Sequence, residues 1–182
     1  MTTQPLLQGL PARIRDDCRV LVLGSMPGAA SLRQARYYAH PRNRFWPLMA
    51  ALCGFDAALD AEARMQALHA AGVGLWDVIG QCRRRGSLDA AIVRGSEIPN
   101  ALPERIAQLP QLRAIACNGA AAAQAFARFV QPHLPLRDPP LVLLVLLALP
   151  SSSPANAAFA WPRLLQAWSP LQQWLRVPMA GD

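Results

Sequence analysis

The 182-residue sequence contains no lysine, because all 18 of its basic residues are arginine. A Walker A phosphate-binding loop and a pyridoxal Schiff base both need a lysine side chain, so the sequence excludes these two chemistries. A side-chain amine that attacks a sugar aldehyde is excluded as well, so the N-terminal amine is the only amine left for that reaction. The missing lysine also fits a GC-rich genome, and we do not interpret it as selected.

Long hydrophobic runs are equally scarce. The longest covers nine residues, Leu141–Leu149, which is too short for a membrane-spanning helix and predicts a buried strand. The first residues also lack a basic segment followed by an apolar one. We therefore expect no secretion signal, a cytoplasmic location and no membrane partner.

Acidic residues and closely spaced cysteines are few. The 11 acidic residues leave a net charge of +7, which favours an anionic partner such as nucleic acid. The sequence has no CxxC pair, whereas metal and iron–sulfur ligands are usually closely spaced. We therefore expect four buried free thiols, no metal site and no cofactor. The cysteines are Cys18, Cys53, Cys82 and Cys117.

The hydrophobic pattern predicts strands that alternate with helices. Strands are predicted at Arg19–Leu23, Val73–Trp76, Leu112–Cys117 and Leu141–Leu147. Helices are predicted at Arg44–Cys53, Leu59–Ala70, from about Pro103, over 120–129 and over Ala157–Leu175, the last interrupted by Pro162 and Pro170. The segment 81–92 (QCRRRGSLDAAI) predicts a basic loop. This order indicates one α/β domain over 1–182, with a core at about 19–175 and a mostly parallel four-stranded sheet covered on both faces.

Small and polar residues follow each predicted strand. These segments are GSMPG at 24–28, DVIGQCRRRGS at 77–87, NGAA at 118–121 and PSSSPAN at 150–156. Ligands of open α/β sheets bind beyond the carboxyl ends of the strands, where these segments would converge. Ordinary turns use the same residue types, so each segment alone leaves both interpretations open.

The segment 37–46 (YYAHPRNRFW) is unusually rich in aromatic and basic residues. Aromatic rings interleaved with arginine suit the binding of a nucleic acid. A base can stack on an aromatic ring while guanidinium groups hold the backbone phosphates. A structural role in the core is the alternative, and we expect it for Phe45 and Trp46 but not for Tyr38.

Taken in order, these motifs resemble the uracil-DNA glycosylase superfamily. The matching segments between Val20 and Phe159 are GSMPG, Ser31-Leu32, YYAHPRNRFW, GLWDVI, RGSLDAAI, IACNG and LPSSSPAN. Among the branches, the pattern is most similar to the hypoxanthine-DNA glycosylase (DNA-deoxyinosine glycosylase) branch. The resemblance implies a three-layer α/β/α fold and a monofunctional enzyme that flips a deaminated base out of DNA and hydrolyses its N-glycosidic bond.

Catalysis is implied for two residues. Relatives often carry Asp or Asn where this chain has Ser25, whose neutral hydroxyl is a poorer acceptor for a water molecule. Asn43 is the position that the deoxyinosine branch is thought to use, and its amide oxygen is expected to accept a hydrogen bond from that water. Asn before a helical segment is also typical of a helix cap, so a structural role stays open.

The resemblance also implies binding residues. Tyr38 would stack on the flipped base, and the backbone near Met26 would line its pocket. Asp77, Asn118 and His40 would contact the base, although each also suits a turn or a structural contact. The expected DNA contacts are Arg42, Arg84 with its neighbours Arg83 and Arg85, Ser151, Ser152, Ser153 and Asn156. The expected partner is single- or double-stranded DNA containing a deaminated base, bound by a monomer.

Two alternatives stay open beside hypoxanthine excision. One is a mismatch-type uracil/thymine glycosylase, and the other is a catalytically silent nucleic-acid-binding domain, which the serine at position 25 would allow. A serine or cysteine hydrolase is disfavoured because no G-x-S-x-G elbow is present.

Overall fold

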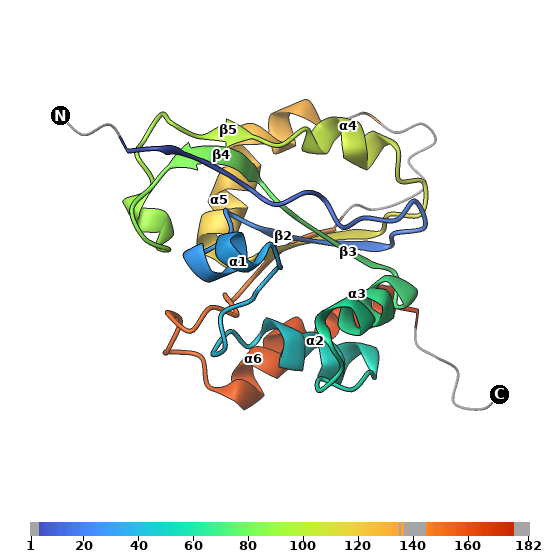
Figure 1. The fold of residues 1–182 in the computed structure, drawn as a ribbon. Coiled ribbons are helices and arrows are strands. Elements are labelled where there is room, and N and C mark those ends of the chain that lie inside the picture. The colour runs from blue at the N-terminus through green and yellow to red at the C-terminus, as the bar shows by residue number, and fades with distance from the viewer. Residues whose placement is uncertain (1–3, 135, 137–144, 177–182) are drawn as a thin grey trace.

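The computed structural model describes residues 4–134, 136 and 145–176, and its centre is a four-stranded parallel sheet (Figure 1). The strands are β2 (Val20–Gly24), β3 (Val73–Asp77), β6 (Ala114–Asn118) and β7 (Val145–Leu149), in the order β3-β2-β6-β7. All three neighbouring pairs are parallel. This sheet confirms the predicted α/β fold. Residues 141–144 of the predicted fourth strand lie outside the described residues.

Helices cover both faces of this sheet, which gives three layers (Figure 1). One face carries α2 (Phe45–Cys53), α3 (Ala61–Ala70) and α6 (Trp161–Trp168), which continues into the 3₁₀ segment η3 (Ser169–Trp174). The other face carries α4 (Leu102–Ala107) and α5 (Ala120–Phe129), and the 3₁₀ segment η2 (Gln131–His133) follows α5. A short helix, α1 (Ala29–Gln34), follows β2.

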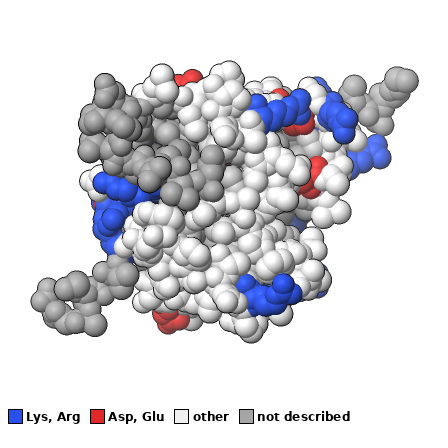
Figure 2. All heavy atoms as spheres, turned by 180° about the vertical axis from the view of Figure 1, so that it is seen from behind, with Lys and Arg blue, Asp and Glu red and all other residues white. Residues whose placement is uncertain are grey.

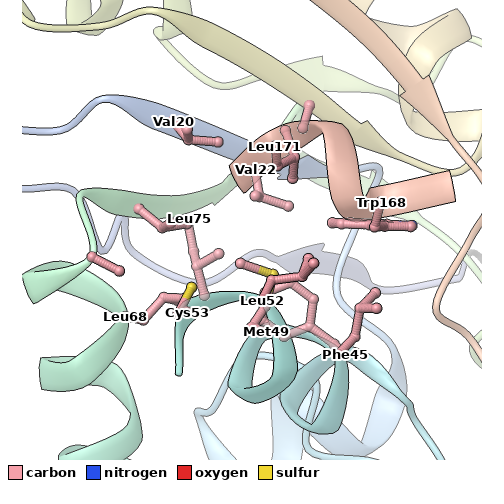
Figure 3. Packing of buried hydrophobic residues seen from close by; sticks show 14 of the residues in the cluster. Val20, Val22, Phe45, Met49, Leu52, Cys53, Leu68, Leu75, Trp168 and Leu171 are labelled. Carbon is pink, nitrogen blue, oxygen red and sulfur yellow. The ribbon is translucent and has the colours of Figure 1, made fainter. Parts of the chain in front are cut away.

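Side chains of β2 alternate between two hydrophobic clusters, as the pleat of a strand requires. Val20 and Val22 face the cluster that contains α2, α3 and α6, while Leu21 and Leu23 face the cluster of α4 and α5. Figure 3 shows the first cluster, where Phe45 and Trp168 pack from facing helices beneath the sheet. The strand is buried on both sides, which explains its continuous apolar sequence.

A second, antiparallel sheet corrects the predicted basic loop at 81–92. It contains β1 (Leu6–Gln8), β4 (Ile79–Arg83) and β5 (Ile98–Pro99), in the order β1-β4-β5. Cys82 is buried while Gln81 and Arg83 are half-buried, which is the alternation of a strand. Three consecutive arginines obscure this period in the sequence. The rest of the segment holds the 3₁₀ turn η1 (Asp89–Ala91).

The two prolines near the C-terminus mark changes in the last helical segment. The helix begins at Trp161 rather than at residue 157, with Pro162 in its first turn, where the missing N–H leaves no hydrogen bond unmade. Pro170 lies where the α-helix changes to the 3₁₀ segment η3. In the part of the chain described here, no helix is long and apolar enough to cross a membrane.

The four cysteines are buried and free. Burial raises the pKa of Cys18, Cys53 and Cys117 to about 12, so these thiols stay protonated at neutral pH. Within the described residues, no three His, Cys, Asp or Glu side chains are grouped in a way that would hold a metal ion.

Candidate active site

A pocket of about 310 Å³ lies at the carboxyl edge of the parallel sheet. Its walls come from the loop 24–28 after β2, the end of β3, the end of β6 and the segment 151–155 after β7. The size falls in the usual range for small-molecule sites. Most of the residues expected to bind or react line it together, namely Ser25, Met26, Tyr38, His40, Asn43, Asp77, Asn118, Ser151, Ser152 and Ser153.

A second cavity of about 450 Å³ adjoins this pocket and shares Tyr37, Tyr38, His40 and Asn43 with it. Its remaining wall includes Arg13, whose guanidinium is paired with Glu62 at 3.1 Å. We place the reacting centre in the smaller pocket because the loops that follow the parallel strands line only that one.

Tyr38 forms an aromatic wall of the pocket. Its backbone adopts a positive φ of 53°, and its ring stacks on Phe45 with centroids 3.8 Å apart. The hydroxyl is buried and makes no well-formed hydrogen bond among the described residues, although the nearby Asn118 side chain lowers the pKa of Tyr38 against the larger effect of burial. Burial and the neighbouring Asp77 charge raise the pKa of Tyr38, so the phenol stays neutral. Phe45 and Trp46 are core residues, as expected.

Asp77 ends β3 and is only 4% exposed. It lies opposite Gly24 in the sheet, where a Cβ atom would collide with the carboxylate Oδ1, so a larger residue at position 24 would displace this carboxylate. Its Oδ2 is buried without a hydrogen-bond partner within the described part of the chain. Burial raises the pKa of Asp77 to about 7, the charge of Asp89 adds to the shift, and Arg84 opposes it.

Arg84 is not on the surface where a DNA contact was expected. The side chain is buried, donates from Nη2 to the Pro27 carbonyl and places Nη1 3.9 Å from Asp89 Oδ1. The arginine therefore holds the loop 24–28 against η1 and is not free to bind a phosphate. Its neighbour Arg85 is exposed, whereas Arg83 is half-buried and donates to the Gln4 carbonyl.

The segment 87–89 also lines the pocket, although the sequence assigned it no role. The Ser87 hydroxyl accepts the Ala29 N–H at 2.9 Å, which ties this segment to the start of α1. Asp89 lies beside Ser25, whose side-chain hydrogen bond lowers the pKa of Asp89 against the larger, opposite effect of burial. The segment RGSLDAAI is one of the motifs that resemble the superfamily, but its sequence did not indicate which of its residues line the pocket.

Asn43 lies just before α2 and lines the pocket. Its Oδ1 accepts the Phe45 N–H at 2.9 Å in a turn that leads into the helix, but the N-cap residue is Arg44, so Asn43 is not the expected helix cap. The same oxygen accepts the Ser152 hydroxyl at 3.0 Å. Ser152 also exchanges two hydrogen bonds with the Asn118 side chain, at 2.8 and 2.9 Å.

Ser152 is fully buried, which is a correction to its expected contact with DNA. Its neighbours Ser151 and Ser153 are half-buried and line the pocket, so their hydroxyls remain accessible. Asn156 donates from Nδ2 to the Ser151 carbonyl at 2.9 Å and thus closes the loop on itself. Arg44, which the sequence did not single out, donates to the carbonyls of Asn156 and Phe159 and ties this loop to α2.

His40 lines the pocket, and Arg42 follows it two residues later in the chain. The Arg42 N–H donates to His40 Nδ1 at 3.1 Å, so the neutral ring carries its hydrogen on Nε2. The Arg42 side chain is exposed. Met26 is buried in the second hydrophobic cluster and contributes to the pocket wall.

The chain is similar in sequence to known proteins. The family model of the uracil DNA glycosylase superfamily matches residues 11–174. A protein of Methanosarcina barkeri named hypoxanthine DNA glycosylase is 40% identical over 86 residues, which cover 47% of this chain and 54% of that protein. A protein of the same name from Methanosarcina acetivorans is 34% identical over 118 residues, covering 64% of this chain and 73% of that protein.

A solved structure is also similar. The solution NMR structure of a Methanosarcina acetivorans protein, described as a candidate uracil DNA glycosylase, aligns with a TM-score of 0.75 at 28% identity. The alignment covers 93% of this chain and 98% of that protein.

Proposed function

The chain belongs to the uracil DNA glycosylase superfamily, and from this premise we propose that it is a monofunctional DNA glycosylase that excises hypoxanthine. The reaction hydrolyses the bond between a deaminated base and deoxyribose and leaves an abasic site. The base must first be rotated out of the DNA into the pocket, where the enzyme can reach the bond.

The observation that carries this proposal is a pair of buried polar atoms in the pocket wall that lack a well-formed hydrogen bond to any described residue. They are the Tyr38 hydroxyl and Asp77 Oδ2. Buried polar groups are normally satisfied, because leaving one unpaired costs about 1–3 kcal/mol. The polar edge of a base would supply these missing partners, while the aromatic ring of Tyr38 supports stacking.

The choice of hypoxanthine rests on the two Methanosarcina relatives that carry this base in their names. Hypoxanthine and uracil share a ring N–H next to a carbonyl, so a pocket with one buried carboxyl group suits both. Uracil is the second candidate, because the similar NMR structure is described by that activity.

The residues divide the work of the reaction between them. Asn43 and Ser25 both line the pocket. In this proposal Asn43 acts on the reacting atoms, and Ser25 takes the position where many relatives carry a stronger acceptor for the water. The Nε2–H of a neutral His40 is a further donor for the departing base. Arg42 outside the pocket, with Ser151 and Ser153 in the pocket wall, would contact DNA phosphates.

A single-turnover assay tests the proposal directly. Duplexes and single strands that hold one hypoxanthine, uracil, xanthine or mismatched thymine are incubated with excess protein, and abasic sites are cleaved with alkali. We expect cleavage at hypoxanthine and none in a matched strand with adenine at that position.

Other results would contradict the proposal in distinct ways. Cleavage only at uracil or thymine would retain the glycosylase and change its substrate. DNA binding without cleavage of any strand would favour a catalytically silent binding domain.

A further inference from the structure

Two backbone N–H groups determine how the side-chain amides of Asn43 and Asn118 are oriented. A backbone N–H can only donate, so each atom that it contacts must be an amide oxygen. The Phe45 N–H contacts Asn43 Oδ1 at 2.9 Å, and the Ser152 N–H contacts Asn118 Oδ1 at 2.8 Å. Neither amide can be flipped without placing two donors against each other.

Ser152 links the two asparagines, because its hydroxyl accepts a hydrogen bond from Asn118 and donates one to Asn43. With Asn118 Oδ1 assigned, the other atom of that amide is Nδ2, which donates to Ser152 Oγ at 2.9 Å. A hydroxyl has one hydrogen to donate, and here it goes to Asn43 Oδ1 at 3.0 Å. The fully buried position of Ser152 leaves no water to compete for that hydrogen.

Asn43 therefore presents only a donor to the pocket. Its Oδ1 already accepts two hydrogen bonds, which is the ordinary capacity of an amide oxygen. Its Nδ2 donates to no group within the described residues, and the side chain lines the pocket. The expectation that the amide oxygen orients the attacking water does not fit this arrangement.

We propose that Asn43 acts on the flipped base as a hydrogen-bond donor through Nδ2, and that Ser152, held by Asn118, is the positioning residue that fixes this polarity. The proposal rests on the proposed glycosylase function and assigns the atom through which its main polar residue works. It concerns the departing base rather than the water.

The chemistry of hydrolysis explains why a donor is useful here. The bond between C1′ and the base nitrogen breaks with its electron pair on the base, water adds to C1′ and loses a proton, and the base gains one. Negative charge therefore develops on the base as the bond breaks. A fixed N–H beside that charge stabilises the transition state, whereas a carbonyl oxygen would repel it.

The substitution Asn43→Asp separates the two possible roles. A carboxylate keeps both accepting contacts, to the Phe45 N–H and to the Ser152 hydroxyl, but replaces the pocket-facing NH₂ with an acceptor. We expect the single-turnover rate on deoxyinosine DNA to fall roughly 100-fold or more, which is typical for loss of one such donor. The thermal midpoint should stay near that of the wild-type chain, since both hydrogen bonds to the oxygen at position 43 are retained. Asn43→Ala should lose both activity and part of the stability.

Ser152→Ala tests the positioning role. We expect a lower single-turnover rate at saturating protein with little change in the Kd for DNA, and partial recovery in Ser152→Thr, which restores the hydroxyl. Ser169→Ala is the matched control, because Ser169 lines neither cavity, its hydroxyl donates to the Gln166 carbonyl, and its loss should leave the rate unchanged.

The outcomes distinguish this inference from the proposed function. An Asn43→Asp variant as active as a wild-type chain that releases hypoxanthine would overturn the donor role alone. A wild-type chain that releases no base from any duplex would overturn the proposed function, and the donor role with it.

Discussion

Asp77 shows how one buried carboxyl group links the pocket to the stability of the fold. The neighbouring charges have opposite signs, because Asp89 raises the pKa of Asp77 and Arg84 lowers it, while burial is the largest cause of its rise to about 7. The native state therefore holds a proton that the unfolded chain releases near pH 3.8. Between these two values, raising the pH favours the unfolded state.

The free energy of unfolding should fall as the pH rises from about 4 to about 7, by on the order of a few kcal/mol, and then level off. Asp77→Asn should remove this slope and be more stable than the wild-type chain at pH 8. Urea unfolding at pH 5 and pH 8 measures both effects. Glu104→Gln, at an exposed position on α4, is the control. An unchanged slope in Asp77→Asn would assign the pH dependence to another group.

At the scale of elements, the loop after β2 depends on contacts from β4 and η1 more than on its own sequence. Arg84, the residue after β4, donates to Pro27, and the Ser87 hydroxyl accepts from Ala29. The segment between β4 and η1 thus holds the loop that follows the parallel strand β2. The sequence analysis predicted only a basic loop here, because residue type alone does not distinguish a buried arginine from an exposed one.

Arg84→Ala should lower the free energy of unfolding by about 2 kcal/mol, since a charged donor to a buried carbonyl is lost. Arg85→Ala should change it by less than about 0.5 kcal/mol, because Arg85 is exposed. Urea unfolding of the two variants provides the comparison. Equal losses in both would show that Arg84 does not support the loop.

At the scale of the whole molecule, the net charge of +7 is carried by arginines that are spread widely. On the face shown in Figure 2, basic side chains form separate groups with uncharged surface between them. Several arginines also donate hydrogen bonds to carbonyl groups of the protein itself, as Arg84 and Arg44 do. Few positive groups are therefore left near the pocket to contact DNA phosphates, with Arg42 among them.

DNA affinity should decrease with salt, by a slope of about −0.9 per phosphate contact in a plot of log K against log salt. Arg42→Gln should make this slope shallower by about one contact, whereas Arg113→Gln should not, because Arg113 precedes β6 at the opposite edge of the sheet. Fluorescence anisotropy between 50 and 200 mM salt, a range typical for such measurements, detects the difference. A slope unchanged by Arg42→Gln would remove that residue from the interface.

The sequence by itself determined the four parallel strands, the main helices between them and the edge at which polar loops gather, but not the antiparallel sheet of β1, β4 and β5. These features follow from local hydrophobic periodicity and from the connection rules of β-α units, both of which are written along the chain. The aromatic block at 37–46 likewise indicated a stacking wall, and Tyr38 lines the pocket while Phe45 and Trp46 are buried.

Only the tertiary structure decided which polar side chains turn inward and what they contact. Arg84 and Arg85 are neighbours of identical type, yet one is buried and the other exposed. The hydrogen bond that sets the polarity of Asn43 comes from Ser152, 109 residues further along the chain. Such contacts depend on the packing of distant segments, because hydrogen-bond direction is a property of geometry that residue type and spacing do not contain.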